Sequence, residues 1–311
     1  MKSPNNFLKA AAMLFLLMPV ALAFAGSSSV NCNKKSLATV IDKLDKTASN
    51  IVEISGNCIE DILISGHADL TLIGIGGASI TATILWDPEA EDPFSATTSL
   101  HIENSKVTVV DLTIFGGTQG VFCDNRSQCI LTDVTILAGL GGIYVQGQSA
   151  LDLIGTSSVN GAQDNGIQVF GASSVNLRPT WAFGYDRDEA GPVIIGSGFT
   201  GLFVSDGSFL RADNVTVSNS AYGVWAQRNS TLKFITTAVG TGAIYNTSVG
   251  IRLRSTSTGQ IIGVVSNNGL GIQVGPLSYF QDNGVAFSGN GTDVDCDHAT
   301  SVSQPSSWCT P

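Results

Sequence analysis

Apolar and polar residues alternate over many short stretches of the chain, as in residues 107–114 and 214–217. A period of two places successive side chains on opposite faces of a strand, so these stretches predict short β-strands with one buried face. Turn-forming Asp, Asn and Gly residues separate them, as at 164–166, 267–269 and 283–284. The pattern predicts a chain made of strands and turns.

A glycine followed by an apolar-x-apolar triplet recurs along the chain, at Gly120, Gly142, Gly166, Gly201, Gly223, Gly250 and Gly271. The steps between these glycines are 22, 24, 35, 22, 27 and 21 residues. Such self-similarity indicates stacked supersecondary units, and units of this length are too short for four-stranded propeller blades. We therefore predict an all-β fold, a right-handed parallel β-helix solenoid whose strands stack about 4.8 Å apart.

The N-terminal segment is typical of an export signal. Lys2 and Lys9 precede an apolar run at residues 10–25, which ends in the small-x-small pattern Ala23-Phe24-Ala25. We expect cleavage after Ala25, a secreted or periplasmic protein, and no membrane insertion after the signal peptide is removed. Cleavage takes away two lysines and no acidic residue, so the net charge changes from −10 to −12. This charge argues against nucleic acid and anionic membranes as partners.

The ends of the predicted solenoid need covers. Leu37, Val40, Ile41 and Leu44 have helical spacing within residues 36–46, and Ser36 is suited to the N-cap. The predicted organisation is a signal peptide at 1–25, an N-terminal cap with an amphipathic helix at 26–50, a parallel β-helix at 51–295 and a C-terminal disulfide loop at 296–311.

The chain has six cysteines, all beyond the predicted cleavage site, and an even number in an exported chain indicates disulfides. Because solenoid coils contact only their neighbours, the favoured pairs join residues close in sequence: Cys32 with Cys58, Cys123 with Cys129, and Cys296 with Cys309. The cysteines and the three histidines do not have metal-ligand spacing, so no metal site and no cofactor are expected.

The order of a helix, then strands at 51–56 and 70–74, then glycine-led coils resembles the pectin-lyase-like superfamily. More closely, it is similar to exported bacterial right-handed β-helix repeat proteins that have no assigned activity. The resemblance covers about residues 36–295. It implies that the glycine-led strand lines a groove that holds a polysaccharide.

The repeat also predicts which side chains face solvent. If the second and fourth positions of each motif point inward, the third points outward. These third positions form one column: Phe122, Tyr144, Gln168, Phe203, Trp225, Arg252 and Gln273. A second column lies two residues further on: Asp124, Gln146, Phe170, Ser205, Gln227, Arg254 and Gly275.

Exposed aromatic rings offer stacking faces to sugars, and amide or guanidinium groups bind hydroxyls and uronate carboxylates. The candidate substrate-binding residues are Tyr144, Phe203, Trp225, Gln227, Arg252 and Arg254. The first hypothesis is therefore a protein that binds an extended polysaccharide without catalysis. Another is a structural envelope protein whose aromatic residues only rigidify the sheet, with Arg252 over Trp225 as a cation–π pair.

The remaining hypothesis is a polysaccharide lyase or epimerase acting on a uronate polymer. Arg252 or Arg254 is then the catalytic candidate, with Tyr144 or another residue as base. Tyr144 is remote from these arginines along the stack, and Asp124 alone gives only weak support for calcium. A polygalacturonase-type hydrolase is disfavoured, because Asp164 and Asp282 lie on different coils and are interpreted as turn formers.

Two insertions interrupt the rhythm of the coils. Residues 86–94 are acidic and are interpreted as a solvated loop. Residues 178–191 mix aromatic and acidic side chains, account for the 35-residue step and are a candidate specificity loop. This second loop leaves a strand other than the glycine-led one, so we do not expect it to reach the same groove.

Overall fold

The computed structural model describes residues 26–85, 87, 89, 97–180, 191–236, 243–296 and 301–303. The predicted signal peptide, most of the acidic insertion, residues 181–190 and Cys309 lie outside the described residues.

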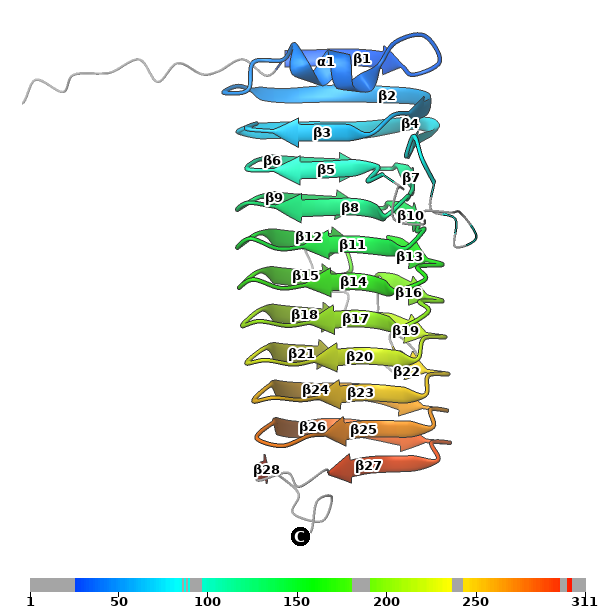
Figure 1. Cartoon of the computed structure of the whole chain (residues 1–311), viewed down its shortest axis with the longest axis vertical. Helices are drawn as coiled ribbons and strands as arrows, with labels where there is room; N and C mark the ends of the chain where they lie inside the picture. The colour runs from blue at the N-terminus through cyan, green and yellow to red at the C-terminus, as the bar shows by residue number, and fades with distance from the viewer. Residues whose placement is uncertain are drawn as a thin grey trace, which may run out of the picture.

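The described chain winds into tiers of short parallel strands (Figure 1). One side of the solenoid is a sheet of ten strands, which we call the front sheet. In stacking order its strands are β3 (Ile62–Ser65), β5 (Leu100–Glu103), β8 (Gln119–Asp124), β11 (Gly141–Val145), β14 (Asn165–Val169), β17 (Thr200–Val204), β20 (Tyr222–Ala226), β23 (Val249–Leu253), β25 (Leu270–Val274) and β27 (Thr292–Cys296). Strands β8 to β25 are the seven glycine-led strands that the sequence repeat predicted.

The other sides form a second, folded sheet. Its strands are β1 (Gly26–Asn31), β2 (Ser49–Ile59), β4 (Asp69–Thr81), β6 (Lys106–Val110), β7 (Thr113–Phe115), β9 (Gln128–Thr132), β10 (Thr135–Leu137), β12 (Ala150–Ile154), β13 (Ser158–Asn160), β15 (Ser174–Arg178), β16 (Val193–Ile195), β18 (Phe209–Asp213), β19 (Thr216–Ser218), β21 (Thr231–Ile235), β22 (Ala243–Tyr245), β24 (Thr258–Ser266), β26 (Tyr279–Ser288) and β28 (Ser301–Ser303). In Figure 1 the front strands run from right to left while the chain descends, so the coil is right-handed. The predicted parallel β-helix is confirmed.

The core fills the inside of the coil with inward-facing apolar side chains, for example Val145, Leu153 and Val159, each with no exposed surface. The repeated glycine lies where each tier bends into its front strand. A Cβ atom on Gly142 would lie 2.2 Å from the carbonyl oxygen of Gly166 and 2.4 Å from Cγ1 of Val159. The glycine therefore recurs because this bend leaves no room for a side chain.

A short helix, α1 (Leu37–Asp42), covers the N-terminal end of the core with its buried residues Leu37 and Ile41. Ser36 is its N-cap, as predicted, and accepts a hydrogen bond from the Thr39 backbone N–H at 3.1 Å. The helix ends at Asp42, earlier than residue 46, because the chain then turns. The Asp45 carboxylate stabilises that turn by accepting a hydrogen bond from the Thr47 N–H at 2.9 Å.

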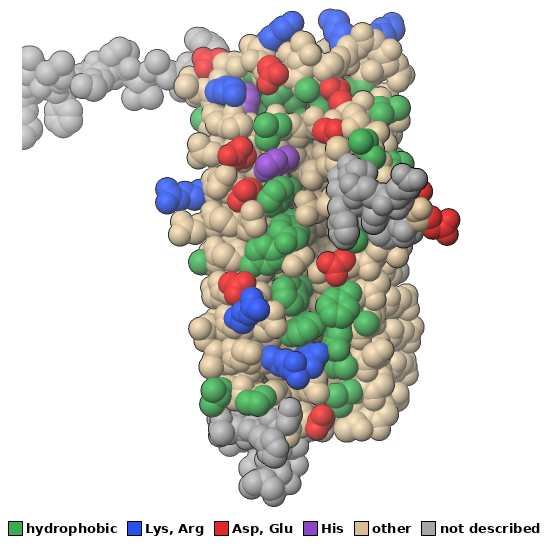
Figure 2. All heavy atoms as spheres, viewed as in Figure 1, with side chains coloured by type: hydrophobic (Ala, Val, Ile, Leu, Met, Phe, Trp, Pro, Cys, Tyr) green, Lys and Arg blue, Asp and Glu red, His purple; other side chains and the backbone are tan. Residues whose placement is uncertain are grey.

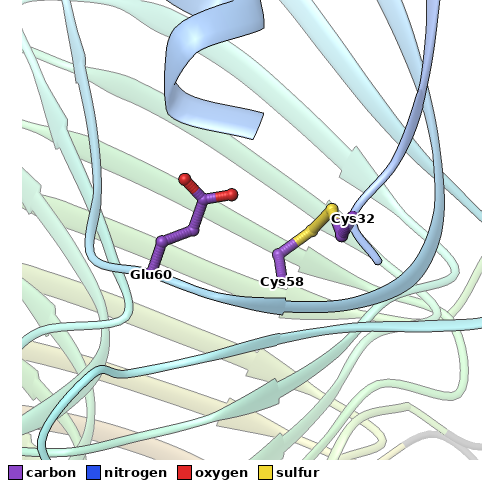
Figure 3. A group of neighbouring side chains, drawn as sticks. All are labelled: Cys32, Cys58 and Glu60. Atoms are coloured by element: carbon purple, nitrogen blue, oxygen red, sulfur yellow. A yellow bond between two sulfur atoms is a disulfide. The ribbon is translucent and has the colours of Figure 1, made fainter. Parts of the chain in front are cut away.

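Glu60 holds the start of this helix. Its carboxylate accepts hydrogen bonds from the backbone N–H groups of Leu37 (2.6 Å) and Ala38 (3.3 Å), and from the Ser36 hydroxyl (2.7 Å). In Figure 3 Glu60 extends toward the helix beside the Cys32–Cys58 disulfide. These three residues are close enough to be possible metal ligands. Both sulfurs are consumed by the disulfide, however, so the group ties the cap to the first tiers.

The disulfides Cys32–Cys58 and Cys123–Cys129 are both present, as predicted. Cys296 is also disulfide-bonded, and its predicted partner Cys309 lies outside the described residues. Within the described part of the chain, no helix has the length and apolar character needed to cross a membrane.

Candidate functional site

The outward third positions of the front strands lie directly over one another. The register joins them into a single column, which we call the front column: Leu63, His101, Phe122, Tyr144, Gln168, Phe203, Trp225, Arg252, Gln273 and Asp295. The seven residues expected from the sequence are in the predicted order. Two further tiers extend the column upward to Leu63, and one extends it downward to Asp295.

Aromatic rings contact one another in the upper part of the column. The His101 ring stacks on Phe122 with a centroid distance of 4.6 Å, and Phe122 meets Tyr144 edge-on at 5.6 Å. Tyr144 also meets Phe170, which follows β14, edge-on at 4.6 Å. These rings give the upper front sheet a continuous apolar strip, visible in the space-filling view as hydrophobic side chains running down the face (Figure 2).

A second aromatic group surrounds Trp225 in the lower part of the column. Its ring lies 5.6 Å from that of Phe203, 5.0 Å from that of Tyr222 and 5.7 Å from that of Phe199. The guanidinium carbon of Arg252 sits 4.7 Å from the Trp225 ring centroid and 5.0 Å from that of Tyr222. The cation–π contact considered from the sequence is therefore present.

Arg252 and Arg254 bring positive charge to the lower part of the front face. Neither forms an ion pair with another residue that the structure describes, although the chain has a net charge of −10. Burial lowers the pKa of Arg252, interaction with Tyr222 opposes the lowering, and Arg254 adds to it. The Nε atom of Arg252 and the Nε1 atom of Trp225 are buried without a hydrogen-bond partner. Cationic and N–H donor groups therefore meet at the aromatic surface.

Asp164, which immediately precedes β14, belongs to the same face. Its carboxylate accepts a hydrogen bond from the Asn165 side-chain amide at 2.8 Å, and that amide also donates to the Gln168 side-chain oxygen at 3.2 Å. Burial raises the pKa of Asp164, and the hydrogen bond from Asn165 opposes the rise. Burial also raises the pKa of Tyr144, and the negative charge of Asp164 raises it further.

Asp164 thus differs from Asp282, with which the sequence pattern had grouped it. The Asp282 carboxylate accepts hydrogen bonds from the backbone N–H groups of Gly284 (2.8 Å) and Val285 (2.9 Å), so it is a turn former as expected. The Asp164 side chain instead joins a polar group with Asn165 and Gln168 in the front sheet. The described partners of this group are amides and not a second carboxylate.

The second predicted column is not a continuous outward surface. Gln227 and Arg254 are partly exposed, but Ser205 is only 1% exposed and Gly275 is buried. The reason is that each of these residues follows the end of its front strand, at Val204 and Val274 for the two buried ones. Beyond the strand the chain turns, and the period of two no longer sets the direction of the side chain.

The structure does not assemble the candidates for a lyase into one centre. Tyr144 on β11 and Arg252 on β23 are separated by four tiers, or about 19 Å at the usual strand spacing. Asp124 is paired in register with Glu103, and its carboxylate accepts a hydrogen bond from the neighbouring Asn125 N–H at 2.7 Å. Neither carboxylate belongs to a group of three possible metal ligands within the described residues.

A separate hollow of about 280 Å³ lies on the second sheet and is lined by Asn176, Leu177, Arg178, Arg211 and Asp213. Its charged groups are already paired. Arg211 donates to the Asp213 carboxylate at 2.8 and 3.0 Å, and Arg178 lies 4.0 Å from the Asp152 carboxylate. The front sheet, where Arg252 and Arg254 have no ion-pair partner among the described residues and lie near partly buried aromatic rings, is the stronger candidate.

No family model and no curated protein matches this chain. Among solved structures it is similar to an alginate lyase from Paenibacillus sp. (10% identity, TM-score 0.39), with 88% of this chain and 99% of that one covered. It is also similar to the A-module of a mannuronan C-5 epimerase from Azotobacter vinelandii (12% identity, TM-score 0.40, with 88% and 99% covered). A third similar structure is a pectin methylesterase from Aspergillus niger (12% identity, TM-score 0.31, with 89% and 90% covered).

Likenesses this distant carry no conclusion about chemistry, which rests on the residues of the chain itself. By its own strand stacking, the protein is a right-handed parallel β-helix.

Proposed function

We propose that this protein is exported and binds an extended polysaccharide along the front column, with an acidic sugar seated at Arg252 and Arg254. Support comes from the place where aromatic surface and unpaired positive charge coincide, around Trp225. Aromatic faces stack on the apolar faces of sugars, and guanidinium groups bind carboxylates through paired hydrogen bonds. A polymer lying along the solenoid axis would meet one tier after another.

Binding without catalysis is the function that this arrangement favours. General acid–base catalysis requires the participating groups within hydrogen-bond reach of one reacting sugar. Tyr144 and Arg252 are four tiers apart, so a single sugar does not contact both. The partly exposed Gln227, two residues after Trp225 on the same tier, adds an amide that can bind hydroxyl groups.

Binding of the exported chain to a panel of acidic and neutral polysaccharides, measured by calorimetry, tests this proposal. Replacing Trp225 with alanine removes the central stacking surface, and we expect about a 5- to 150-fold loss of affinity, the range that follows if the ring contributes the roughly 1–3 kcal/mol of base–aromatic stacking. Arg252→Ala should weaken acidic polymers more than neutral ones. The matched control is Lys233→Ala, which removes a cation from β21 on the second sheet and should leave binding unchanged.

Two results contradict the proposal. If Trp225→Ala binds every polymer as the parent protein does, the stacked rings are structural. If unsaturated uronate products accumulate, followed by their ultraviolet absorbance, and disappear in Arg252→Ala, the protein is a lyase.

A further inference from the structure

The charges along the front face are unevenly distributed. In the front and second columns, the described cations are Arg252 and Arg254, both on the tier of β23. Carboxylates lie above and below them: Glu103 and Asp124 on β5 and β8, Asp164 at the start of β14, and Asp295 on β27. A ligand that follows these columns therefore meets positive charge at one tier and negative charge at several, while Arg228, just beyond Gln227, is paired with Asp206.

On the upper side of this cationic tier, Asp164 is the nearest front-face carboxylate without an ion-pair partner among the described residues, because Asp206, after β17, pairs with Arg228 at 3.4 Å. β14 and β23 are separated by three tiers, which is about 14 Å at the usual strand spacing. Each sugar of an extended chain adds a length similar to the spacing between two neighbouring tiers. A polymer with a carboxylate on every sugar that is held at Arg252 would thus bring another carboxylate close to Asp164.

The surroundings of Asp164 suit a neutral sugar. Its carboxylate accepts a hydrogen bond from the Asn165 side-chain amide, and none of the described ion pairs includes it. Asn165 is only 6% exposed and is fixed by a second bond to Gln168. The Oδ1 atom of Asn165 is buried without a hydrogen-bond partner. The half-buried Asp164 carboxylate can accept hydrogen bonds from sugar hydroxyls, whereas a uronate carboxylate offers it no proton.

We infer that the bound polymer carries its acidic groups at intervals, separated by neutral sugars, and that Asp164 discriminates against polymers that are acidic at every sugar. This inference rests on the proposed function and narrows its substrate class. The Asp164 carboxylate repels a homopolymeric uronate chain, because such a chain would place one of its own carboxylates at the same tier. Because Asp164 is half-buried, solvent screens that repulsion less than it would at an exposed site.

Three polymers distinguish the possibilities: polygalacturonate, which is acidic at every sugar; gellan, in which one uronate recurs among neutral sugars; and a neutral β-glucan. Affinities are measured for the parent chain and for Asp164→Asn, which keeps the shape of the side chain and removes its charge. We expect the parent to prefer gellan to polygalacturonate by about tenfold, the factor that 1.4 kcal/mol supplies. Asp164→Asn should tighten polygalacturonate by a similar factor and leave gellan within about twofold.

The matched control is Glu53→Gln, which removes the same net charge from an exposed position on β2, outside the front sheet. If it tightens polygalacturonate as much as Asp164→Asn does, overall charge sets the preference and the inference is overturned. The inference also fails if Asp164→Asn, shown by thermal unfolding to be folded, keeps the parent's ratio of affinities. Failure of the parent chain to bind any of the three polymers overturns the proposed function itself.

Discussion

The partial burial of Asp164 makes the stability of the fold depend on pH. Because burial raises its pKa above the ordinary value of 3.8, the folded chain binds the proton more tightly than the unfolded chain does. The contribution of this group to stability is therefore full below pH 3.8 and is lost as the pH rises through the folded pKa. Asp164→Asn should flatten the dependence of the unfolding free energy on pH in that window, as urea titrations at a series of pH values would show. An unchanged dependence would contradict the assignment.

At the same scale, the sequence predicted some residues of the site and missed others. Phe203, Trp225 and Arg252 follow from the period of two, because they lie inside regular strands where alternation fixes their direction. Phe199 and Tyr222 precede the repeated glycine, where the chain bends and alternation no longer applies. An aromatic residue one to three positions before the motif is the signal that would have found them.

Asp164 was missed for the same reason. It stands in an Asp-Asn-Gly sequence, which is also the commonest kind of turn signal, and local sequence does not separate the two roles. The hydrogen bond from Asn165, which also binds Gln168, and the nearby Tyr144 on the neighbouring tier distinguish it from Asp282. The contacts between tiers join residues twenty or more positions apart, so local sequence does not record them.

At the scale of the element, buried polar side chains connect successive turns. The hydroxyl oxygen of Ser127 accepts a hydrogen bond from the Ser105 N–H at 3.4 Å, and the oxygen of Ser149 accepts one from the Ser127 N–H at 3.1 Å. Ser173 and Ser208 continue this ladder. All five serines are at most 5% exposed, so the ladder satisfies backbone groups that the turns would otherwise bury unpaired.

We expect a large loss of stability when the repeated glycine at the start of a front strand is replaced. In Gly142→Ala the new Cβ atom would meet the Gly166 carbonyl oxygen, a backbone atom that cannot move without displacing the next tier. We expect a loss of roughly 3 kcal/mol in unfolding free energy, at the upper end of the usual cost of overpacking. Urea denaturation followed by circular dichroism measures it.

Gly207→Ala is the control for this prediction. Its Cβ atom would have nothing within 4 Å, so the expected cost is that of a positive φ of 71°, about 1–2 kcal/mol. Equal losses in the two variants would mean that tier spacing does not depend on the glycine at the bend.

At the scale of the whole molecule, the architecture could be predicted from the repeat. Each tier contacts only its neighbours, so a sequence pattern that predicts one tier also predicts the next. The ends of the solenoid do not obey that rule. β1 pairs in parallel with β2, yet it lies in a segment with no glycine-led motif, and α1 is six residues long because Glu60 fixes its start and a turn ends it. The ends are set by individual contacts that no periodicity records.

This difference predicts where the molecule opens first. Solenoids fray from their ends, and the Cys32–Cys58 disulfide closes a loop of 26 residues across the N-terminal tiers. Replacing both cysteines with alanine should lower stability by about 3.5 kcal/mol, the cost expected from that loop length. Hydrogen exchange should accelerate in β1, α1 and β2 first, while β14 to β20 stay protected.

The Cys123–Cys129 disulfide provides the comparison, since it closes a loop of six residues in the middle of the stack. Its loss should cost about 2 kcal/mol by the same relation. Exchange should then rise around β8 and β9, with both sides still supported by intact tiers. If removing either disulfide accelerates exchange evenly along the chain, the tiers unfold as one unit, and the N-terminal cap does not set the point of opening.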